Sequence, residues 1–186
     1  MIYSIIGKIY LFKMIDLFKN IFLRYKLNKR LKILESQSKE KIKSFSSMVI
    51  LTPNNEIDEN VFFSLADSLK ISYKKITLVV ISDKKFSKSK ARFRKIIYCS
   101  REKVGLLGKF DNEMLSFFDQ KFDLLINYFS SSTIFPELVS ACCSSKFRLG
   151  FYQVNHKIND IILKINLEDK QTFLDESKNY LKSLLK

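Results

Sequence analysis

The fold is decided between residues 123 and 152, where the sequence reads Asp123-Leu-Leu-Ile-Asn-Tyr-Phe129, continues through a helical stretch from Ile134 to Ser144, and ends in Lys146-Phe-Arg-Leu-Gly-Phe-Tyr152. The two outer runs are short and mostly apolar, which is typical of buried β-strands. Pro136 falls in the first turn of the helix between them, where a missing N–H is tolerated. A strand, a helix and a strand in succession predict a parallel strand pair crossed by the helix.

The same alternation continues in both directions along the chain. The clearest strand is Lys75-Ile-Thr-Leu-Val-Val-Ile-Ser82, because β-branched residues dominate it. Strands are expected at residues 47–52, 75–82, 94–100, 123–129, 146–152 and 160–166. Helices are expected at residues 57–69, 113–120, 134–144 and 170–186, with Asn112 capping the second of them. Because several strands are continuously apolar, we predict an α/β fold, a three-layer sandwich around a mostly parallel sheet of about five or six strands.

Composition excludes several classes of protein. The chain has 186 residues, of which 46% are hydrophobic, including 17 Phe and 8 Tyr, so it can bury a core and is not a disordered chain. Four Gly and two Pro exclude collagen-like and low-complexity sequences. No stretch approaches the roughly 18 uncharged apolar residues of a membrane-spanning helix. The length fits one domain plus an appendage.

The appendage is a basic N-terminal arm. The chain has a net charge of +14, and residues 1–47 carry +8 of it. Apolar residues in this arm recur at steps of three and four, which places them on one face of a helix. They are Leu11, Met14, Ile15, Phe18, Ile21, Phe22 and Tyr25, followed by a thinner stripe of Leu27, Leu31 and Leu34. We therefore predict a basic amphipathic helical arm at residues 1–46 and a single α/β domain at residues 47–186.

Three roles compete for the arm. It packs on the body, lies on an anionic membrane surface, or mediates self-association or another protein contact. In the second role, Lys13, Lys19 and Arg24 contact the surface. The arm does not resemble a secretory signal, because charged residues interrupt it and no small-residue cleavage site follows. Met14 is an alternative start, which would remove the first 13 residues.

Three cysteines and one histidine offer little chemistry. Cys99, Cys142 and Cys143 form neither a disulfide framework nor a C-x-x-C pair, which fits a reducing cytoplasm. A catalytic triad or dyad would have to use His156, which lies in a polar stretch that reads as a loop. The sequence contains no G-x-G-x-x-G, G-x-x-x-x-G-K-[ST], G-x-S-x-G or H-E-x-x-H motif. We expect no catalytic residue, no cofactor and no metal.

Polar residues at the carboxyl ends of the strands are the candidates for ligand binding. In open parallel sheets, ligands bind at that edge, near a reversal of strand order. We expect Asn127 and Tyr128 to orient a ligand there, beside Gly150, and Arg148 or Arg101 to pair with an anionic group. The competing interpretation is that such polar residues cap helices and form turns.

A second basic segment spans residues 84–95. It holds seven cations and two aromatic residues, and the cations include Lys84, Lys85, Arg92 and Arg94. Such a segment grips phosphates while its rings stack on bases, or it forms a solvated connection with its Phe side chains turned inward. Without the signature of a nucleic-acid-binding fold, this partner is suggested by charge alone and is not favoured.

Three segments carry a resemblance to a known family: Gly108-Lys-Phe110, Phe122-Asp-Leu-Leu-Ile-Asn-Tyr-Phe129 and Lys146-Phe-Arg-Leu-Gly-Phe151. Together with the basic stretch at residues 25–32, they resemble a family of uncharacterised small proteins of Bacteroidota, over roughly residues 20–185. This resemblance implies a fold and a localisation but no activity. A looser likeness, through residues 148–151, is to the acceptor-side domain of heptosyltransferase-like glycosyltransferases, of which this chain would be a degenerate half.

The favoured function is that of a non-catalytic α/β protein of the cytoplasm, peripheral to the inner membrane, whose basic arm contacts an anionic membrane surface or a protein partner. The first alternative is a small-ligand binder or an enzyme that uses the carboxyl ends of the strands. The second alternative is electrostatic nucleic-acid binding through residues 84–95.

Overall fold

The computed structural model describes the chain except for residues 1, 39–41, 54–56, 84–90 and 186, and it describes residues 2–13 by their backbone alone. Six strands form one sheet in the order β3-β2-β1-β4-β5-β6. They are β1 (Met48–Thr52), β2 (Ile76–Ser82), β3 (Lys95–Ser100), β4 (Lys121–Asn127), β5 (Ser144–Phe151) and β6 (Ile161–Leu163). Every pair of neighbouring strands is parallel. The prediction of an α/β fold with a mostly parallel sheet is therefore confirmed.

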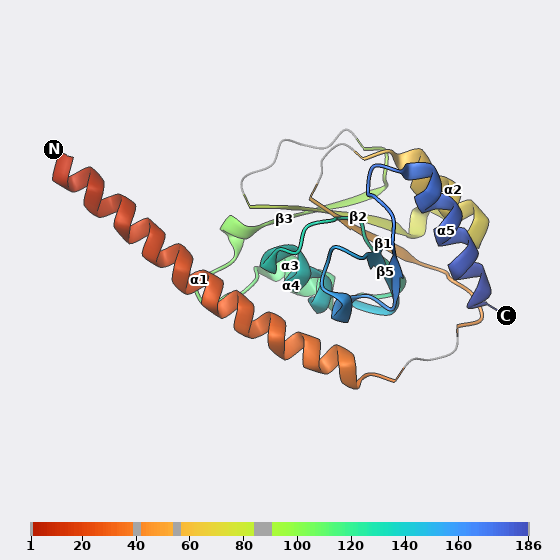
Figure 1. Cartoon of the computed structure of the whole chain (residues 1–186), viewed down its shortest axis with the longest axis horizontal. Helices are drawn as coiled ribbons and strands as arrows, with labels where there is room; N and C mark the ends of the chain where they lie inside the picture. Colours follow the sequence, from red (N-terminus) through yellow and green to blue (C-terminus); the bar gives the residue numbers. More distant parts are fainter. Residues whose placement is uncertain (1, 39–41, 54–56, 84–90, 186) are drawn as a thin grey trace.

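Helices cover both faces of the sheet (Figure 1). One face carries α1 (Ile2–Ser36), α3 (Asn112–Phe118) and α4 (Ile134–Cys142), and the other carries α2 (Glu59–Leu69) and α5 (Lys170–Ser183). The described 3-10 helices are η1 (Tyr73–Lys75), η2 (Arg101–Lys103) and η3 (His156–Ile158). The predicted three-layer sandwich and its N-terminal helix are confirmed.

The buried strands divide the core into two halves. On β1, Val49 and Leu51 belong to the half that contains α1, α3 and α4, whereas Met48 and Ile50 belong to the half that contains α2 and α5. All five residues of β1 are buried, because strands flank it on both sides and helices cover both faces. This arrangement explains why the central strands are continuously apolar rather than alternating.

Aspartates cap three of the helices at their N-termini. Asp58 begins α2, Asp111 begins α3 and Asp169 begins α5, each by accepting a hydrogen bond from a backbone N–H of the first turn. The prediction that Asn112 caps α3 was wrong by one position. The carboxylate of Asp111 reaches the N–H of Met114 at 2.9 Å, three residues on, so Asn112 is already the first helical residue.

The helix α1 packs on the body through its second half. The buried side chains of that half are Leu23, Leu27 and Leu31, which lie in the core beside α4. Two lysines attach the helix to neighbouring loops: Nζ of Lys19 donates to the carbonyl of Arg101 at 2.6 Å, and Nζ of Lys26 donates to the carbonyl of Gly108 at 2.9 Å. The first half extends beyond the body, as Figure 1 shows.

Candidate functional site

Two of the predicted ligand residues, Asn127 and Gly150, lie side by side on β4 and β5. Asn127 is wholly buried, and its Nδ2 donates to Oδ1 of Asn159 at 2.7 Å. Gly150 makes room for this bond, because a Cβ at that position would lie 2.4 Å from the same oxygen. Oδ1 of Asn127 and Nδ2 of Asn159 have no partner in the described part of the chain. The amide pair therefore links β4 to the segment before β6 inside the core.

Tyr128 lies on the opposite face of the sheet from Asn127, since successive residues of an extended chain alternate. Its hydroxyl donates to the carbonyl of Leu167 at 3.1 Å, and burial raises the pKa of the phenol. Its ring meets three aromatic rings of the α2 and α5 side edge-on, those of Phe62, Phe151 and Phe173. Tyr128 is therefore a core residue, and its side chain does not lie beside that of Asn127.

Arg148 is buried, and its guanidinium lies at the C-terminal end of α4. Its Nη1 donates to the carbonyl of Ser140 at 2.9 Å, and its Nη2 donates to the carbonyl of Cys143. The last carbonyls of a helix lack partners within the helix and carry partial negative charge, so a guanidinium there satisfies and neutralises them. Burial lowers the pKa of this guanidinium. Arg148 thus has a structural role in the fold.

Arg101 lies elsewhere, at the junction of β3 with α1. Its guanidinium donates to Oδ1 of Asn20 at 2.9 Å and lies 3.6 Å from the carboxylate of Asp16 and 3.9 Å from that of Asp83. The five predicted residues therefore do not line one pocket. Ligand binding by any of them stays a prediction.

A hollow of about 370 Å³ does lie at the carboxyl edge, where the strand order reverses between β1 and β4. It is lined by Pro53, Ile81, Ser82, Asp83, Ser131, Thr133, Phe135 and Pro136. None of the five predicted residues is among them. The position of the hollow agrees with the rule for open parallel sheets, although its lining is different from the one expected.

The second basic segment is only partly described. Lys84 and Lys85 lie outside the described residues. Arg92 is exposed and pairs through Nε with Oε2 of Glu59 at 3.2 Å, and Arg94 is exposed just before β3. Phe93 is buried, which agrees with the expectation that a Phe side chain of this segment turns inward. Nucleic-acid binding stays a prediction.

The apolar stripe predicted on α1 is mostly exposed where its side chains are described: Phe22 is half-buried, and the side chain of Leu11 lies outside the described residues. Met14, Phe18, Ile21 and Tyr25 follow one another at steps of four, three and four, with 55%, 48%, 55% and 66% of their surfaces exposed. The buried leucines lie about 150° around the helix from this stripe. The helix therefore has two apolar faces, one packed against the body and one open to solvent. Packing on the body is confirmed for the thinner leucine stripe only.

Charged side chains divide between the two sides of α1. Both described acidic residues of the helix pair with cations of the body: Asp16 with Arg101 at 3.6 Å, and Glu35 with Lys157 at 2.9 Å. Lys19 also turns to the body, where burial lowers the pKa of its ammonium, so it does not belong to the outer face as we had expected.

The exposed side of α1 also carries basic side chains. Arg24, Lys29 and Lys32 are exposed and pair with no acidic side chain of the described residues. The side chain of Lys13, which was also predicted to contact a surface, lies outside the description. The exposed apolar stripe is consequently accompanied by cations that have no acidic partner among the described residues, whereas both described acidic side chains of the helix pair with the body.

A loop adds exposed leucines next to this helix. Leu106 and Leu107 are exposed in the connection between η2 and α3. Gly108 follows them with a φ of 70°, and a Cβ there would lie 3.2 Å from the side chain of Lys26. With the bond from Lys26 to the Gly108 carbonyl, this close approach holds the loop against α1.

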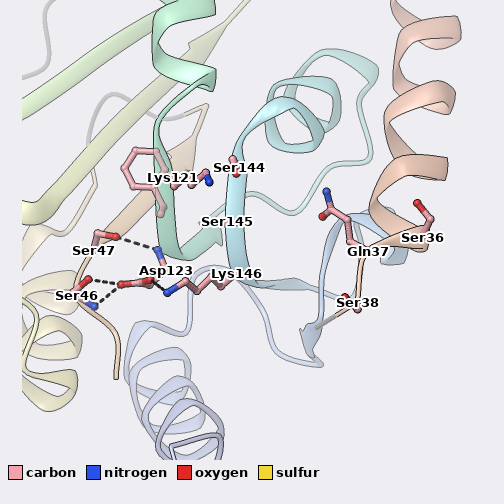
Figure 2. A pocket seen from close by; sticks show the side chains of 11 residues that line it. Ser36, Gln37, Ser38, Ser46, Ser47, Lys121, Asp123, Ser144, Ser145 and Lys146 are labelled. Carbon is pink, nitrogen blue, oxygen red and sulfur yellow. Dashed lines mark hydrogen bonds and ion pairs between the residues drawn. The ribbon is translucent and has the colours of Figure 1, made fainter. Parts of the chain in front are cut away.

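A groove of about 670 Å³ lies at the opposite, amino edge of the sheet, between the end of α1 and the starts of β1, β4 and β5 (Figure 2). Its lining is mostly polar: Ser36, Gln37, Ser38, Ser46, Ser47, Lys121, Phe122, Asp123, Ser144, Ser145 and Lys146. The sequence analysis missed this groove. Its signal was the Ser and Lys residues at the beginnings of two predicted strands, whereas the predicted ligand site lies at the carboxyl ends of the strands.

Asp123 is the centre of the polar contacts in the groove, as Figure 2 shows. Its Oδ2 accepts hydrogen bonds from the N–H of Ser46 at 2.7 Å and from the hydroxyl of Ser46 at 2.5 Å, and its Oδ1 accepts from the ammonium of Lys146 at 2.8 Å. Its own N–H donates to Oγ of Ser47 at 3.0 Å. Burial opposes ionisation of the carboxyl, but these bonds outweigh it and hold the pKa of Asp123 below its ordinary value.

Fold and sites together define a doubly wound, all-parallel α/β protein with a basic helix attached to one face. Comparison with known families assigns it further: the chain belongs to a family of unknown function (DUF6913), which it matches over residues 19–184. This confirms the predicted membership of a domain of unknown function. No curated protein and no solved structure matches the chain. The Bacteroidota source and the likeness to heptosyltransferases stay predictions.

The described residues contain neither a membrane-spanning helix nor a cluster of metal ligands. No helix in that part of the chain has the length and apolar character needed to cross a bilayer. Nor do its His, Cys, Asp and Glu side chains gather anywhere into a group of three or more that would hold a metal ion.

Proposed function

We propose that this chain is a peripheral α/β protein that attaches to the anionic, cytoplasmic surface of a membrane through the outer face of α1. The observation that carries this proposal is the sorting of side chains on that helix. Its outer face has an exposed apolar stripe at Met14, Phe18, Ile21 and Tyr25, and its acidic residues are paired with the body. An interfacial helix has this composition, because apolar side chains enter the acyl boundary while cations meet lipid phosphates.

Both kinds of contact are needed. Full burial of a large apolar side chain is worth about 1.5–3 kcal/mol, and these side chains are already partly covered, so each offers roughly 1 kcal/mol. A cation near an anionic surface contributes about 1 kcal/mol as well. The cations that supply this electrostatic contribution lie near the C-terminal end of the stripe or beyond it: Arg24, Lys29 and Lys32. Binding should therefore depend on salt and on anionic lipid.

The charge of the chain favours a lipid surface over a second copy. The net charge is +14, so two copies repel each other, and pairing their outer helix faces would bring exposed cations together without acidic partners. The exposed Leu106 and Leu107 extend the apolar surface beside α1. Three free cysteines agree with the reducing compartment that this surface faces.

Sedimentation with vesicles tests the proposal. The purified full chain is mixed with vesicles of neutral lipid, or of neutral lipid with about one-third phosphatidylglycerol, at about 0.15 M and about 0.5 M salt. We expect it to pellet with the anionic vesicles at low salt and to be released at high salt. The triple variant Arg24→Glu, Lys29→Glu, Lys32→Glu should lose at least tenfold in affinity.

A matched control carries the same change of charge elsewhere. Lys74, Lys164 and Lys182 are exposed, away from α1, and the variant with Glu at all three should bind as the wild type does or slightly less. Equal losses in the two triple variants would show a non-specific charge effect and overturn the proposal. So would a wild-type chain that stays in the supernatant, and in that case a protein partner for the stripe becomes the better assignment.

A further inference from the structure

We propose that the groove at the amino edge of the sheet binds a water-soluble phosphate monoester with a hydroxyl-bearing organic part. This site is separate from the outer face of α1, and the inference does not depend on membrane binding. Its volume of about 670 Å³ falls within the range of small-molecule sites, about 300–1,000 Å³. Four parts of the chain form it: the end of α1 and the starts of β1, β4 and β5 (Figure 2).

Among the described residues of the lining, Asp123 is the one acidic residue, and its hydrogen-bonding capacity is largely used. Asp123 accepts two hydrogen bonds from Ser46 and one from Lys146, so its carboxylate has little capacity left for a ligand. Its effect is to fix the positions of Ser46 and Lys146 at the wall. Because the pKa of Asp123 is held low, this arrangement persists at neutral pH.

The groups that remain are mainly donors and cations. Lys121 is exposed, and no acidic side chain of the described residues pairs with it. Register places Lys121 beside Ser144, so the starts of β4 and β5 present an exposed ammonium and an exposed hydroxyl together, whereas Ser145 pairs with Phe122 in the next register position. Oγ of Ser145 also has no hydrogen-bond partner among the described residues, but it is buried beneath the surface of the groove. A set of N–H and O–H donors with net positive charge suits the oxygens of a phosphate.

The surroundings strengthen the positive potential. A neighbouring hollow shares Ser46 with the groove and contributes Lys43 and Lys70, and no carboxylate is found among the described residues that line it. Lysines that converge on a concave surface concentrate anions there. The groove therefore selects first for negative charge.

Size and polarity select the rest of the ligand. Inorganic phosphate would fill only a small part of the groove, and the hydroxyls of Ser38 and Ser47 with the amide of Gln37 remain to bind a polyhydroxylated group. Phe122 is the one apolar residue among the described residues of the lining, so an acyl chain would meet few apolar side chains there. This favours a soluble phosphate ester over a lipid headgroup.

Titration calorimetry of the full chain tests the assignment, with glucose 6-phosphate as probe and glucose, inorganic phosphate and sulfate as comparisons. We expect glucose 6-phosphate to bind more tightly than phosphate or sulfate, and glucose to give no heat. Lys121→Gln combined with Ser144→Ala should weaken the probe at least tenfold, and Lys121→Arg should retain most of the binding. The control Lys164→Gln removes one exposed cation on another part of the surface and should change nothing.

Three outcomes would overturn the assignment. The first is that glucose 6-phosphate at about 10 mM gives no heat. The second is that Lys164→Gln weakens binding as much as the double variant of the groove does, which would mean general attraction of anions to a basic surface. A third is loss of vesicle pelleting in the Lys121→Gln, Ser144→Ala variant, which would make a lipid headgroup the ligand. Because that variant leaves α1 untouched, failure here and failure of membrane attachment are distinguishable.

Discussion

The side chain of Asn159 occupies the space above Gly150, where a Cβ would lie only 2.4 Å from its Oδ1. The amide in turn accepts a hydrogen bond from the wholly buried Asn127 at 2.7 Å. A glycine on β5 is therefore what allows a polar bridge between β4 and the segment before β6. Its conformation is ordinary, so the requirement comes from the close approach and not from the backbone.

Replacing this glycine should destabilise the fold. Gly150→Ala should lower the free energy of unfolding by about 1–3 kcal/mol, because a methyl group forces Asn159 away and breaks a buried hydrogen bond. Gly105→Ala is the matched control: a Cβ there meets its nearest atom at 3.6 Å, and the change should stay within about 0.5 kcal/mol. Urea unfolding of both variants measures the difference, and equal losses would contradict the account.

The two apolar faces of α1 should separate stability from surface binding. Leu27→Ala opens a cavity in the core beside α4 and should cost about 2–4 kcal/mol in unfolding free energy. Ile21→Ala removes a side chain that is 55% exposed and should cost less than about 0.5 kcal/mol. Thermal unfolding should show the larger loss of stability in Leu27→Ala. Vesicle pelleting should show the larger loss of binding in Ile21→Ala. A large loss of stability in Ile21→Ala would mean that this face is covered within the folded chain.

Acid should release the contacts of Asp123. The pKa of this carboxyl is lower in the folded chain than in the unfolded chain, where it is about 3.9. Its stabilising contribution is therefore complete above that value and is lost as the pH falls through about 4 toward the folded pKa. Asp123→Asn should be less stable than the wild type at pH 7, with a smaller difference at about pH 2–3. Unfolding free energies measured across that range check this, and a difference that does not change with pH would refute it.

The cysteines should resist thiol reagents while the chain is folded. Burial raises the pKa of Cys99 to about 12, and it raises the pKa of Cys142 and of Cys143 as well. Few thiolates are then present at about pH 8, since the ordinary thiol pKa is about 8.5. Ellman's reagent should label the native chain slowly and all three thiols once urea is added. Rapid labelling of the folded Cys142→Ser variant would contradict the burial of the other two.

Much of the fold could be predicted because local residue patterns indicate its strands and helices. Runs such as Ile76–Ser82 are rich in β-branched residues and buried on both faces, so their strands and the layers above them follow from the residues alone. The reversal of strand order between β1 and β4 depends on pairings between segments more than 70 residues apart, as in Met48 with Leu124, and no local pattern contains it.

The outer face of α1 shows a different limit. A helix with two apolar faces does not reveal which one the body covers, and the more hydrophobic stripe at Phe18 and Ile21 is the exposed one. The choice follows from tertiary contacts, among them the bond from Lys26 to Gly108 and the ion pair of Glu35 with Lys157. Neither partner is close in sequence.

The candidate sites were harder to predict than the fold. Arg148 satisfies helix carbonyls and Tyr128 packs in a ring cluster, roles that a polar residue at a strand end fills as readily as ligand binding. The amino-edge groove is assembled from residues such as Ser36, Asp123 and Lys146, which only the complete sheet brings together.

The opposed faces of α1 also decide how the molecule would be oriented. A helix fixed to the protein along one side and to a flat bilayer along the other cannot roll about its own axis. The body of a chain attached in this way keeps only rotation about the membrane normal. The layer of α2 and α5, which lies across the sheet from α1, then always points to the aqueous phase. Every copy on a vesicle would show the same side to its surroundings, which an unstructured basic tail could not achieve.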